Sequence, residues 1–364
     1  MTAISTKQPH YPVLDGLRGL AILLVVIYHN FDFTNYFFFG WLGVDLFFVL
    51  SGFLITDILL RTLDHPNFLR NFYTRRILRI FPLYYLALFL ILIILPFFKS
   101  LRLDLSYYED HQVWLWTYLQ NWLYTFKHPF GSKILLHFWS LAVEEQFYLL
   151  WPITILLIKK PKVLFVIAIG LLISVGVTRF VLWNLHLKDF AYANFFLFTR
   201  IDGICVGCML ALLIRIDINY LRRKTALIIL ILAVFNFLFY FFNNKYSPGS
   251  PFLAFVGYTT FAILFGLLVY EGVIGKIKIV EKAFNNRVMK FFGKISYGLY
   301  VYHWPVYVLL FPLFKKFFTN QISLSNFPAN IASAFCVIGI SIIISVMSYR
   351  YFESYFLKLK NKFT

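Results

Sequence analysis

The sequence predicts an all-α integral membrane protein, a polytopic bundle of about ten transmembrane helices with both termini in the cytosol. Of the 364 residues, 60% are hydrophobic and only 14% are charged, whereas soluble domains carry about 25% charged residues. The mean hydropathy is +0.74, and the apolar residues form repeated runs of about 20 residues, the length that a helix needs to cross a bilayer. These properties exclude a soluble multidomain protein.

The apolar runs place the helices in order along a single membrane domain, residues 1–364. Lys7 is the only Lys or Arg before the first run, and no small-residue cleavage site follows the run. We therefore expect an uncleaved anchor rather than a secretory signal. No internal repeat or linker divides the chain. The expected spans are 12–30, 40–60, 80–98, 140–158, 162–182, 195–214, 225–242, 252–270, 295–314 and 327–349.

The basic residues set the orientation. With the N-terminus in the cytosol, the inward segments hold 24 of the 34 Lys and Arg residues, as the positive-inside rule requires. The net charge of +18 therefore reflects topology, and we expect no nucleic-acid partner. The expected location is a cell membrane, the plasma or inner membrane of a bacterium, with the lipid bilayer as a partner.

The three cysteines do not indicate a metal or redox site. Cys205 and Cys208 are spaced as CxxC within an apolar run, and Cys336 stands alone. Because no second pair or nearby His completes a ligand set, we expect small buried hydrophobic side chains and no metal.

Two ionisable residues lie in the first span. Arg18 and His29 are eleven positions apart, about 16 Å along a helix at roughly 1.5 Å per residue. A charged side chain within a span costs about 2.5–3.5 kcal/mol on insertion scales, so such residues usually mark a pathway or a reaction centre. An extended cofactor with a phosphate head could bridge the distance between them.

A cluster of arginines stands at the cytosolic entrance of the third span. Arg79 is four positions from Arg75 and three from Arg76, so the guanidinium groups gather on a helix. Planar forked donors suit phosphate oxygens, and Arg18 begins its helix on the same side of the membrane. The pattern indicates either a phosphate-rich cytosolic ligand or anchoring by the positive-inside rule alone.

Near the opposite face, three segments bring His, Asp and Glu side chains to a similar depth, His29 being the histidine. Glu144 and Glu145 open the fourth span, and Asp45 opens the second. A carboxylate can hold an imidazole in the tautomer that a general base requires. The alternative is a polar network that only fixes the packing of the helices.

Other polar and aromatic positions have less certain roles on sequence grounds alone. Arg200 and Asp202 are close neighbours in the sixth span and are expected to neutralise one another, mainly for structure. His303, in the ninth span, could line the same cavity as His29. The outward segment 100–138 carries aromatic residues that fit an interfacial belt or a support for a sugar ring. They are Tyr107, Tyr108, Trp114, Trp116, Tyr118, Trp122 and Tyr124.

Six ordered motifs along almost the whole chain resemble the acyltransferase 3 family of membrane O-acyltransferases. The motifs are LDGLRGLAI at 14–22, GVDLFFVLSGFLI at 43–55, RRILRIFPLYY at 75–85, FWSLAVEEQFYLLWP at 138–152, RIDGICVG at 200–207 and ISYGLYVYHWPV at 295–306. The resemblance implies about ten core helices, an acyl-coenzyme A donor that enters from the cytosol, and transfer to a hydroxyl of a carbohydrate or glycolipid acceptor.

The resemblance also assigns roles to particular residues. Arg18 and His29 match the family's Arg-x10-His element, and Arg76 and Arg79 match its Arg-x-x-Arg element. The arginines, with Arg75, would hold the nucleotide phosphates. His29 would take the proton of the acceptor hydroxyl, directly or after a transient acyl-imidazole.

The expected catalytic residues are His29, Glu145, Glu144 and Asp45, either glutamate being able to orient His29. The expected substrate-binding residues are Trp139, Ser140, Arg200, Asp202 and His303.

The function expected from these features is O-acetyl transfer from acetyl-CoA, or another acyl-CoA, to a surface or secreted glycan or its lipid-linked precursor. Some family members carry an appended extracytoplasmic esterase domain. Because this sequence ends at Thr364, we expect direct transfer or a separate extracytoplasmic acyl-handling protein.

Two other functions fit parts of the sequence. A transporter of a lipid-linked sugar or anion accounts for the charges, but it predicts repeats or broken helices that the sequence lacks. A polytopic glycosyltransferase would need an acidic pair in the first outward loop, where residues 30–40 offer only Asp32.

Overall fold

The computed structural model describes residues 11–34, 36–101, 103–185, 190–218, 221, 225–243, 257–275, 277–360 and 362–363. Every regular element within these ranges is a helix, which confirms the all-α class. Among the described residues, six helices are long and apolar enough to cross a membrane. They cover Pro12–Asn30, Phe39–Thr62, Phe68–Phe97, Leu136–Ile158, Pro161–Asn184 and Asn326–Lys360. Two shorter apolar helices cover Thr225–Phe239 and Tyr258–Ile274.

Some helix boundaries differ from the expected spans. Helix α3 (Phe68–Leu88) begins well before residue 80, because the arginine-rich turn is itself helical, and Pro82 lies within it. The expected span 195–214 is broken at Ile201 into α10 (Leu197–Arg200) and α11 (Asp202–Ile216). The expected span 295–314 lies inside the longer α15 (Arg287–Asn320).

Part of the topology prediction falls outside the described residues. Residues 252–256, the start of an expected span, lie outside the described residues. Five of the basic residues counted as cytosolic lie outside them as well. Those five are Lys7, Arg222, Arg223, Lys224 and Lys276.

The chain forms two compact units, and four helices contribute residues to both of them. Unit 1 comprises the described residues of Met1–Ala21, Leu42–Leu69 and Val143–Gly293; unit 2 comprises those of Ile22–Trp41, Arg70–Ala142 and Lys294–Thr364. The four shared helices are α1 (Pro12–Asn30), α3, α7 (Trp139–Ile158) and α15.

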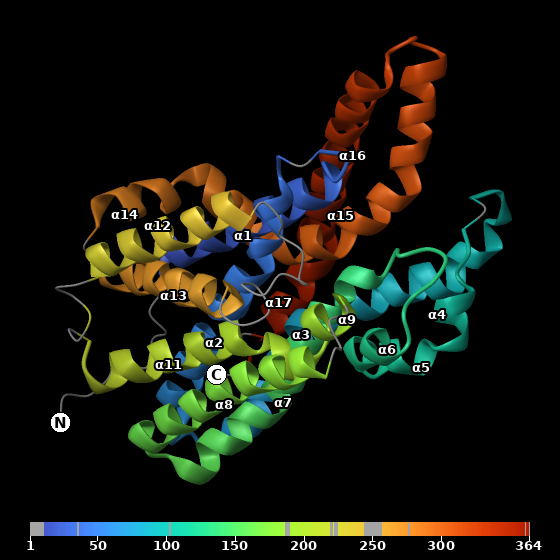
Figure 1. Cartoon of the computed structure of the whole chain (residues 1–364). Coiled ribbons are helices and arrows are strands. Elements are labelled where there is room, and N and C mark those ends of the chain that lie inside the picture. The colour runs from blue at the N-terminus through green and yellow to red at the C-terminus, as the bar shows by residue number, and fades with distance from the viewer. Residues whose placement is uncertain are drawn as a thin grey trace. The chain divides into compact units, whose positions relative to one another are not determined.

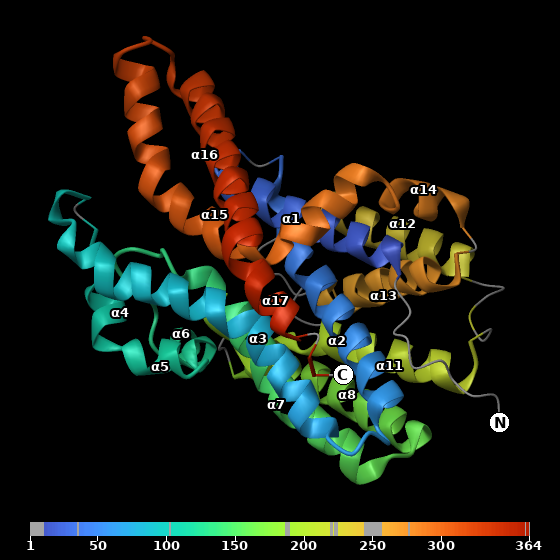
Figure 2. The same ribbon diagram turned by 180° about the vertical axis from the view of Figure 1, so that it is seen from behind.

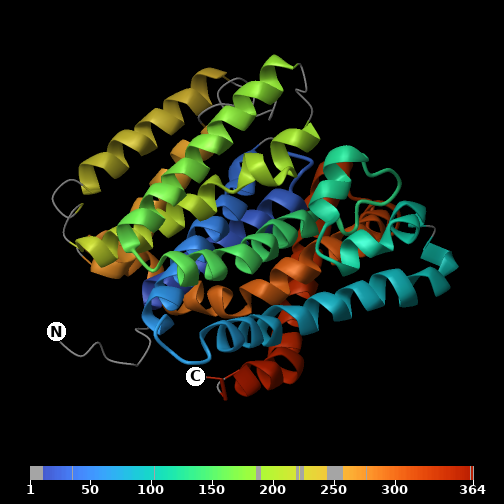
Figure 3. The ribbon, with the colours of Figure 1, turned by 90° about the horizontal axis from the view of Figure 1, so that it is seen from below.

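Helix α11 is central to unit 1, where it contacts α2 (Leu42–Thr62), α8 (Pro161–Asn184) and α13 (Tyr258–Ile274) (Figures 1 and 3). At the crossing of α2 and α11, glycines allow the two backbones to touch. A Cβ atom on Gly52 would overlap the carbonyl oxygen of Ile204, and one on Gly207 would overlap that of Val49. Small residues at a helix crossing permit this close approach within membranes. Cys205 and Cys208 are buried free thiols on the same helix.

Four further helices complete unit 1. Helix α12 (Thr225–Asn243) packs on α13, and the short α14 (Lys278–Phe284) follows α13 in the chain. The short helices α9 (Phe190–Asn194) and α10 connect α8 to α11.

In unit 2, α15 and α16 (Asn326–Ser348) form a helical hairpin (Figure 2). The Tyr302 hydroxyl, on α15, donates to Ser348 Oγ at 3.2 Å near the open end of this hairpin. Helix α16 continues through a π-helical turn, η7 (Tyr349–Glu353), into α17 (Ser354–Lys360). Helix α3 likewise continues into a π-helical segment, η2 (Phe89–Ile94).

Within residues 103–138 the chain forms the short helices α4 (Ser106–Asp110), α5 (Gln112–Trp116) and α6 (Gln120–Phe126). The aromatic rings of Tyr107, Tyr108 and Tyr124 are buried among one another. Tyr118 stacks on Tyr84 of α3, with ring centroids 4.0 Å apart. These four tyrosines are buried in an aromatic core, so they offer no open ring face to a sugar, and the interfacial belt stays a prediction.

Candidate active site

A pair of histidines lies in unit 2, formed by His29 near the end of α1 and His303 on α15. His29 Nδ1 and His303 Nε2 are 3.0 Å apart. His303 Nδ1 faces two backbone carbonyl oxygens, Leu299 O at 3.0 Å and Tyr300 O at 2.8 Å. A carbonyl oxygen only accepts, so the Nδ1 of His303 carries its proton, and in the neutral ring its Nε2 is an acceptor.

This geometry assigns the tautomer of His29. Its Nδ1 must donate to His303 Nε2, and the carbonyl oxygen of Val25, 3.1 Å away, accepts from the same nitrogen. The Nε2 of His29 is then the nitrogen without a proton. A histidine held in this way can accept a proton at Nε2, as a general base does.

Further residues of unit 2 support the pair. The ring of His137 lies 5.3 Å from that of His303, and the Tyr300 hydroxyl is 2.7 Å from the carbonyl oxygen of His137. Ser140 hydrogen-bonds to the Tyr300 hydroxyl. Ser140 and His303 were expected from the sequence as site residues, but His137 was not. Its position just before the FWSLAVEE motif could have indicated that it belongs to the site.

An aromatic platform lies beside His29. The Trp304 ring is 4.8 Å from the His29 ring, and Tyr307 stacks on Trp304 at 5.2 Å with an interplanar angle of 10°. The Tyr307 hydroxyl donates to Asp32 Oδ1 at 2.8 Å. Trp304 Nε1 donates to the carbonyl oxygen of Lys133 at 2.7 Å. Sequence reasoning missed this platform, although Trp304 and Tyr307 are one helical turn apart.

Unit 1 holds a different polar network, made of ion pairs. Arg200 pairs with Asp45 at 2.8 Å, and Arg179 pairs with Asp202 at 2.9 Å; all four side chains are buried. The Thr259 hydroxyl also donates to Asp202, and the Arg200 guanidinium lies over the Tyr258 ring at 4.1 Å.

The break at Ile201 lets Arg200 and Asp202 each form an ion pair with a residue on another helix, and the structural role expected for them stays a prediction. Arg179 was missed, although it is the only charge inside an otherwise apolar run, 163–184.

The remaining predicted residues are distributed over the two units. Arg18 pairs with Asp15 at 3.6 Å in unit 1, which also contains Glu144 and Glu145. Arg75, Arg76, Arg79 and Trp139 belong to unit 2. The expected contacts of His29 with the carboxylates, and of Arg18 with the arginine cluster, join residues of different units and stay predictions. In the described part of the chain, no group of three or more His, Cys, Asp or Glu residues is arranged to hold a metal ion.

Comparison with known proteins gives a consistent family. The model of the acyltransferase 3 family, described as an acyltransferase domain, matches residues 11–350. The chain is 31% identical over 371 residues to the peptidoglycan O-acetyltransferase OatA of Listeria monocytogenes. The aligned region covers 96% of this chain and 56% of that protein. The chain is 32% identical over 339 residues to YrhL of Bacillus subtilis, provisionally named a peptidoglycan O-acetyltransferase, covering 85% of this chain and 50% of that protein.

A provisionally named O-acetyltransferase of Staphylococcus aureus strain COL is 30% identical over 375 residues, covering 97% of this chain and 58% of that protein. The chain thus spans about half the length of the curated relatives that it matches. No solved structure matches it.

Proposed function

The chain belongs to the acyltransferase 3 family, and on that premise we propose that it is a membrane O-acetyltransferase. It would move an acetyl group from cytosolic acetyl-CoA to a hydroxyl group of a cell-wall glycan or of its lipid-linked precursor. The names of the relatives support this acceptor class. The proposal includes the expected topology, with ten spans in the cell membrane and both termini in the cytosol.

The observation that carries the proposal is the tautomer of His29. Its Nε2 would take the proton of the acceptor hydroxyl while the hydroxyl oxygen attacks the thioester carbonyl carbon. The carbon–sulfur bond then breaks, and the leaving thiolate of coenzyme A takes the proton from the imidazolium. The products are the acetyl ester and free coenzyme A. In the second route, His29 Nε2 attacks the thioester carbonyl carbon first and the coenzyme A thiolate leaves, which forms an acetyl-imidazolium. The acceptor oxygen then displaces the imidazole from the acetyl group, and the acceptor's proton passes to the thiolate.

We propose His303 as the residue that orients His29, in place of the carboxylates expected from the sequence. The Nδ1 of His29 already donates to His303 Nε2, which leaves no second proton on a neutral ring for Glu145 or Glu144. Asp45 is bonded to Arg200, so we propose a structural role for it.

For the donor, Arg76 and Arg79 would hold phosphates of coenzyme A, because forked guanidinium donors match phosphate oxygens. The phosphate-binding role expected for Arg18, which belongs to unit 1, stays a prediction. We omit Arg75 from this set, because its Nη1 donates to the carbonyl oxygen of Phe363 at 3.5 Å and it shares a helix face with an apolar groove described below.

For the acceptor, the platform of Trp304 and Tyr307 would support a sugar ring beside His29. Flat aromatic faces suit the apolar face of a sugar, and the Asp32 carboxylate could accept a sugar hydroxyl. Ser140, hydrogen-bonded to the Tyr300 hydroxyl, would fix the position of Tyr300 beside the histidines.

The experiment compares the wild-type chain with His29→Ala in liposomes. It measures release of coenzyme A from acetyl-CoA with a lipid-linked peptidoglycan precursor as acceptor. We expect acceptor-dependent release to fall by about 10²–10⁴-fold, the usual contribution of a general base. His128→Ala, which alters an exposed histidine, is the matched control and should keep full activity. Full activity in His29→Ala would refute the mechanism, and absence of release from the wild type would refute the proposed acetyl transfer to this acceptor.

A further inference from the structure

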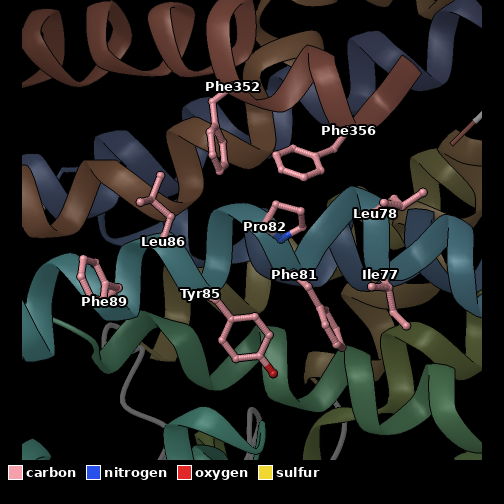
Figure 4. Close-up of a pocket in the computed structure, with 9 residues that line it drawn as sticks. All are labelled: Ile77, Leu78, Phe81, Pro82, Tyr85, Leu86, Phe89, Phe352 and Phe356. Carbon is pink, nitrogen blue, oxygen red and sulfur yellow. The ribbon is translucent and has the colours of Figure 1, made fainter. Parts of the chain in front are cut away.

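An apolar groove with a volume of about 540 Å³ lies along α3 in unit 2. Figure 4 shows Phe352 and Phe356, from η7 and α17, facing Pro82 of α3, with Leu78 and Leu86 on either side of Pro82. The only polar side-chain atom among the lining residues is the Tyr85 hydroxyl, which already donates to the carbonyl oxygen of Trp116 at 3.1 Å. The groove therefore suits a hydrocarbon chain and lacks the polar groups that would recognise a sugar or a nucleotide.

Both walls of the groove include a π-helical turn. Segment η2 begins at Phe89, at one end of the groove, and η7 contains Phe352. Such turns are rare and occur frequently at functional sites. Two such turns at one groove indicate a binding surface rather than an ordinary helix surface that faces lipid.

The other end of the groove is basic. Arg75 precedes Leu78 by three positions and so continues the same face of α3, and Lys360 follows Phe356 by four positions and continues the opposite wall. The bond from Arg75 Nη1 to Phe363 O, at 3.5 Å, shows that the two walls approach each other at this end. The Glu353 carboxylate, on η7, accepts from Ser348 Oγ at 3.1 Å.

We propose that the groove binds one acyl chain of an anionic glycerophospholipid, with the lipid phosphate beside Arg75 and Lys360. The groove lies on a segment long and apolar enough to cross a membrane, so its occupant comes from the bilayer. From Leu78 to Phe89 it extends for about 16 Å at roughly 1.5 Å per residue. That is about half of the roughly 30 Å hydrocarbon core, the depth that one acyl chain covers in one leaflet.

Cations near a membrane surface supply the headgroup preference. One Lys or Arg near an anionic surface contributes about 1 kcal/mol, or about fivefold in affinity. The groove shares no residue with the proposed acetyl-transfer site, so lipid binding can be present whether or not acetyl transfer is.

The test uses the full chain in nanodiscs of phosphatidylcholine mixed with phosphatidylglycerol, with bound lipid counted by native mass spectrometry. We expect the wild type to retain phosphatidylglycerol over phosphatidylcholine by at least about fivefold. Arg75→Gln should reduce this preference by about fivefold, whereas Arg70→Gln, an exposed arginine on the same helix, should leave it unchanged.

Filling the groove gives an independent readout. Leu86→Trp should remove the retained lipid of either kind, and Leu149→Trp, at an exposed position on α7, should not. The proposal is overturned if Leu86→Trp, folded by its thermal unfolding curve, retains lipid as the wild type does. An unchanged preference in Arg75→Gln overturns it as well, and this second arm decides the case if Leu86→Trp does not fold. Displacement of the phospholipid by a polyprenyl-phosphate sugar would also overturn it, in favour of an acceptor-lipid site.

Discussion

The two units of the molecule bury polar groups in contrasting ways. In unit 1, Arg179 and Arg200 each meet a carboxylate, so the buried charges balance within the network. In unit 2, His29 and His303 meet as neutral rings, and the bond between them leaves one nitrogen of His29 ready to accept a proton. A balanced network resists change, whereas an asymmetric hydrogen bond prepares a reactive atom. Burial and polarity alone therefore do not distinguish the two networks; the direction of the hydrogen bonds does, and it supports the proposed role of His29 as the base.

The largest expected effect is on stability, from breaking the unit 1 network. Arg200→Ala should lower the free energy of unfolding by about 3–5 kcal/mol, because Asp45 would remain as a buried charge without its partner. The measurement is denaturant or thermal unfolding in detergent, with exposed Arg215→Ala, on the following helix α11, as control. The double variant Arg200→Met with Asp45→Leu should recover much of the loss. If Arg200→Ala were as stable as the wild type, the ion pair would not hold these helices together.

The next effect should be on rate, from breaking the histidine pair. His303→Ala should lower the turnover number for acetyl transfer by about 10²-fold, because His29 would lose the partner that fixes its tautomer. His303→Gln should restore much of the rate, since a glutamine oxygen can also accept from His29 Nδ1. The two variants should unfold at similar temperatures. Equal loss of activity in His303→Gln and His303→Ala would mean that His303 acts in some other way than by accepting this bond.

A smaller effect is expected on acceptor binding. It would distinguish the unit 2 site, which is proposed to bind an acceptor, from the ion-pair network of unit 1. Tyr307→Phe should raise the KM for the glycan acceptor by about fivefold, because Asp32 would lose the hydroxyl that positions its carboxylate for the sugar, a hydrogen bond that contributes roughly 1 kcal/mol. The KM for acetyl-CoA should not change. The matched control is Tyr302→Phe, on the same helix as Tyr307, which removes a hydroxyl bonded to Ser348 of α16. A rise of both KM values together would indicate general disturbance of α15 rather than loss of an acceptor contact.

The helical class and most spans could be predicted from the sequence, because apolar runs of bilayer length depend on local composition alone. The start of α3 at Phe68 was missed, since arginine-rich residues before an apolar run look like a cytosolic loop. Arg18, His29 and His303 were recognised because each is an ionisable residue in an apolar run.

The partners of these residues could not be predicted, because they depend on contacts distant in the sequence. Asp45 meets Arg200 from another helix, and the tautomer of His29 depends on the carbonyl oxygens that face His303 on α15. Depth in the membrane suggested instead that Asp45 belonged with His29. Spacing along the chain gives the height of a residue in the bilayer but not the side of the helix that it shares with a neighbour.

The glycine crossing in unit 1 also allows its opening to be followed through cysteines that the chain already contains. Cys208 Sγ lies 3.6 Å from the carbonyl oxygen of Gly52, and Cys205 is buried on the same helix. A maleimide dye can reach these thiols only when α2 and α11 separate, so the labelling rate of a Cys336→Ser chain would follow the opening of this crossing in intact vesicles. Stability could then be compared between lipid compositions without extracting the protein into detergent.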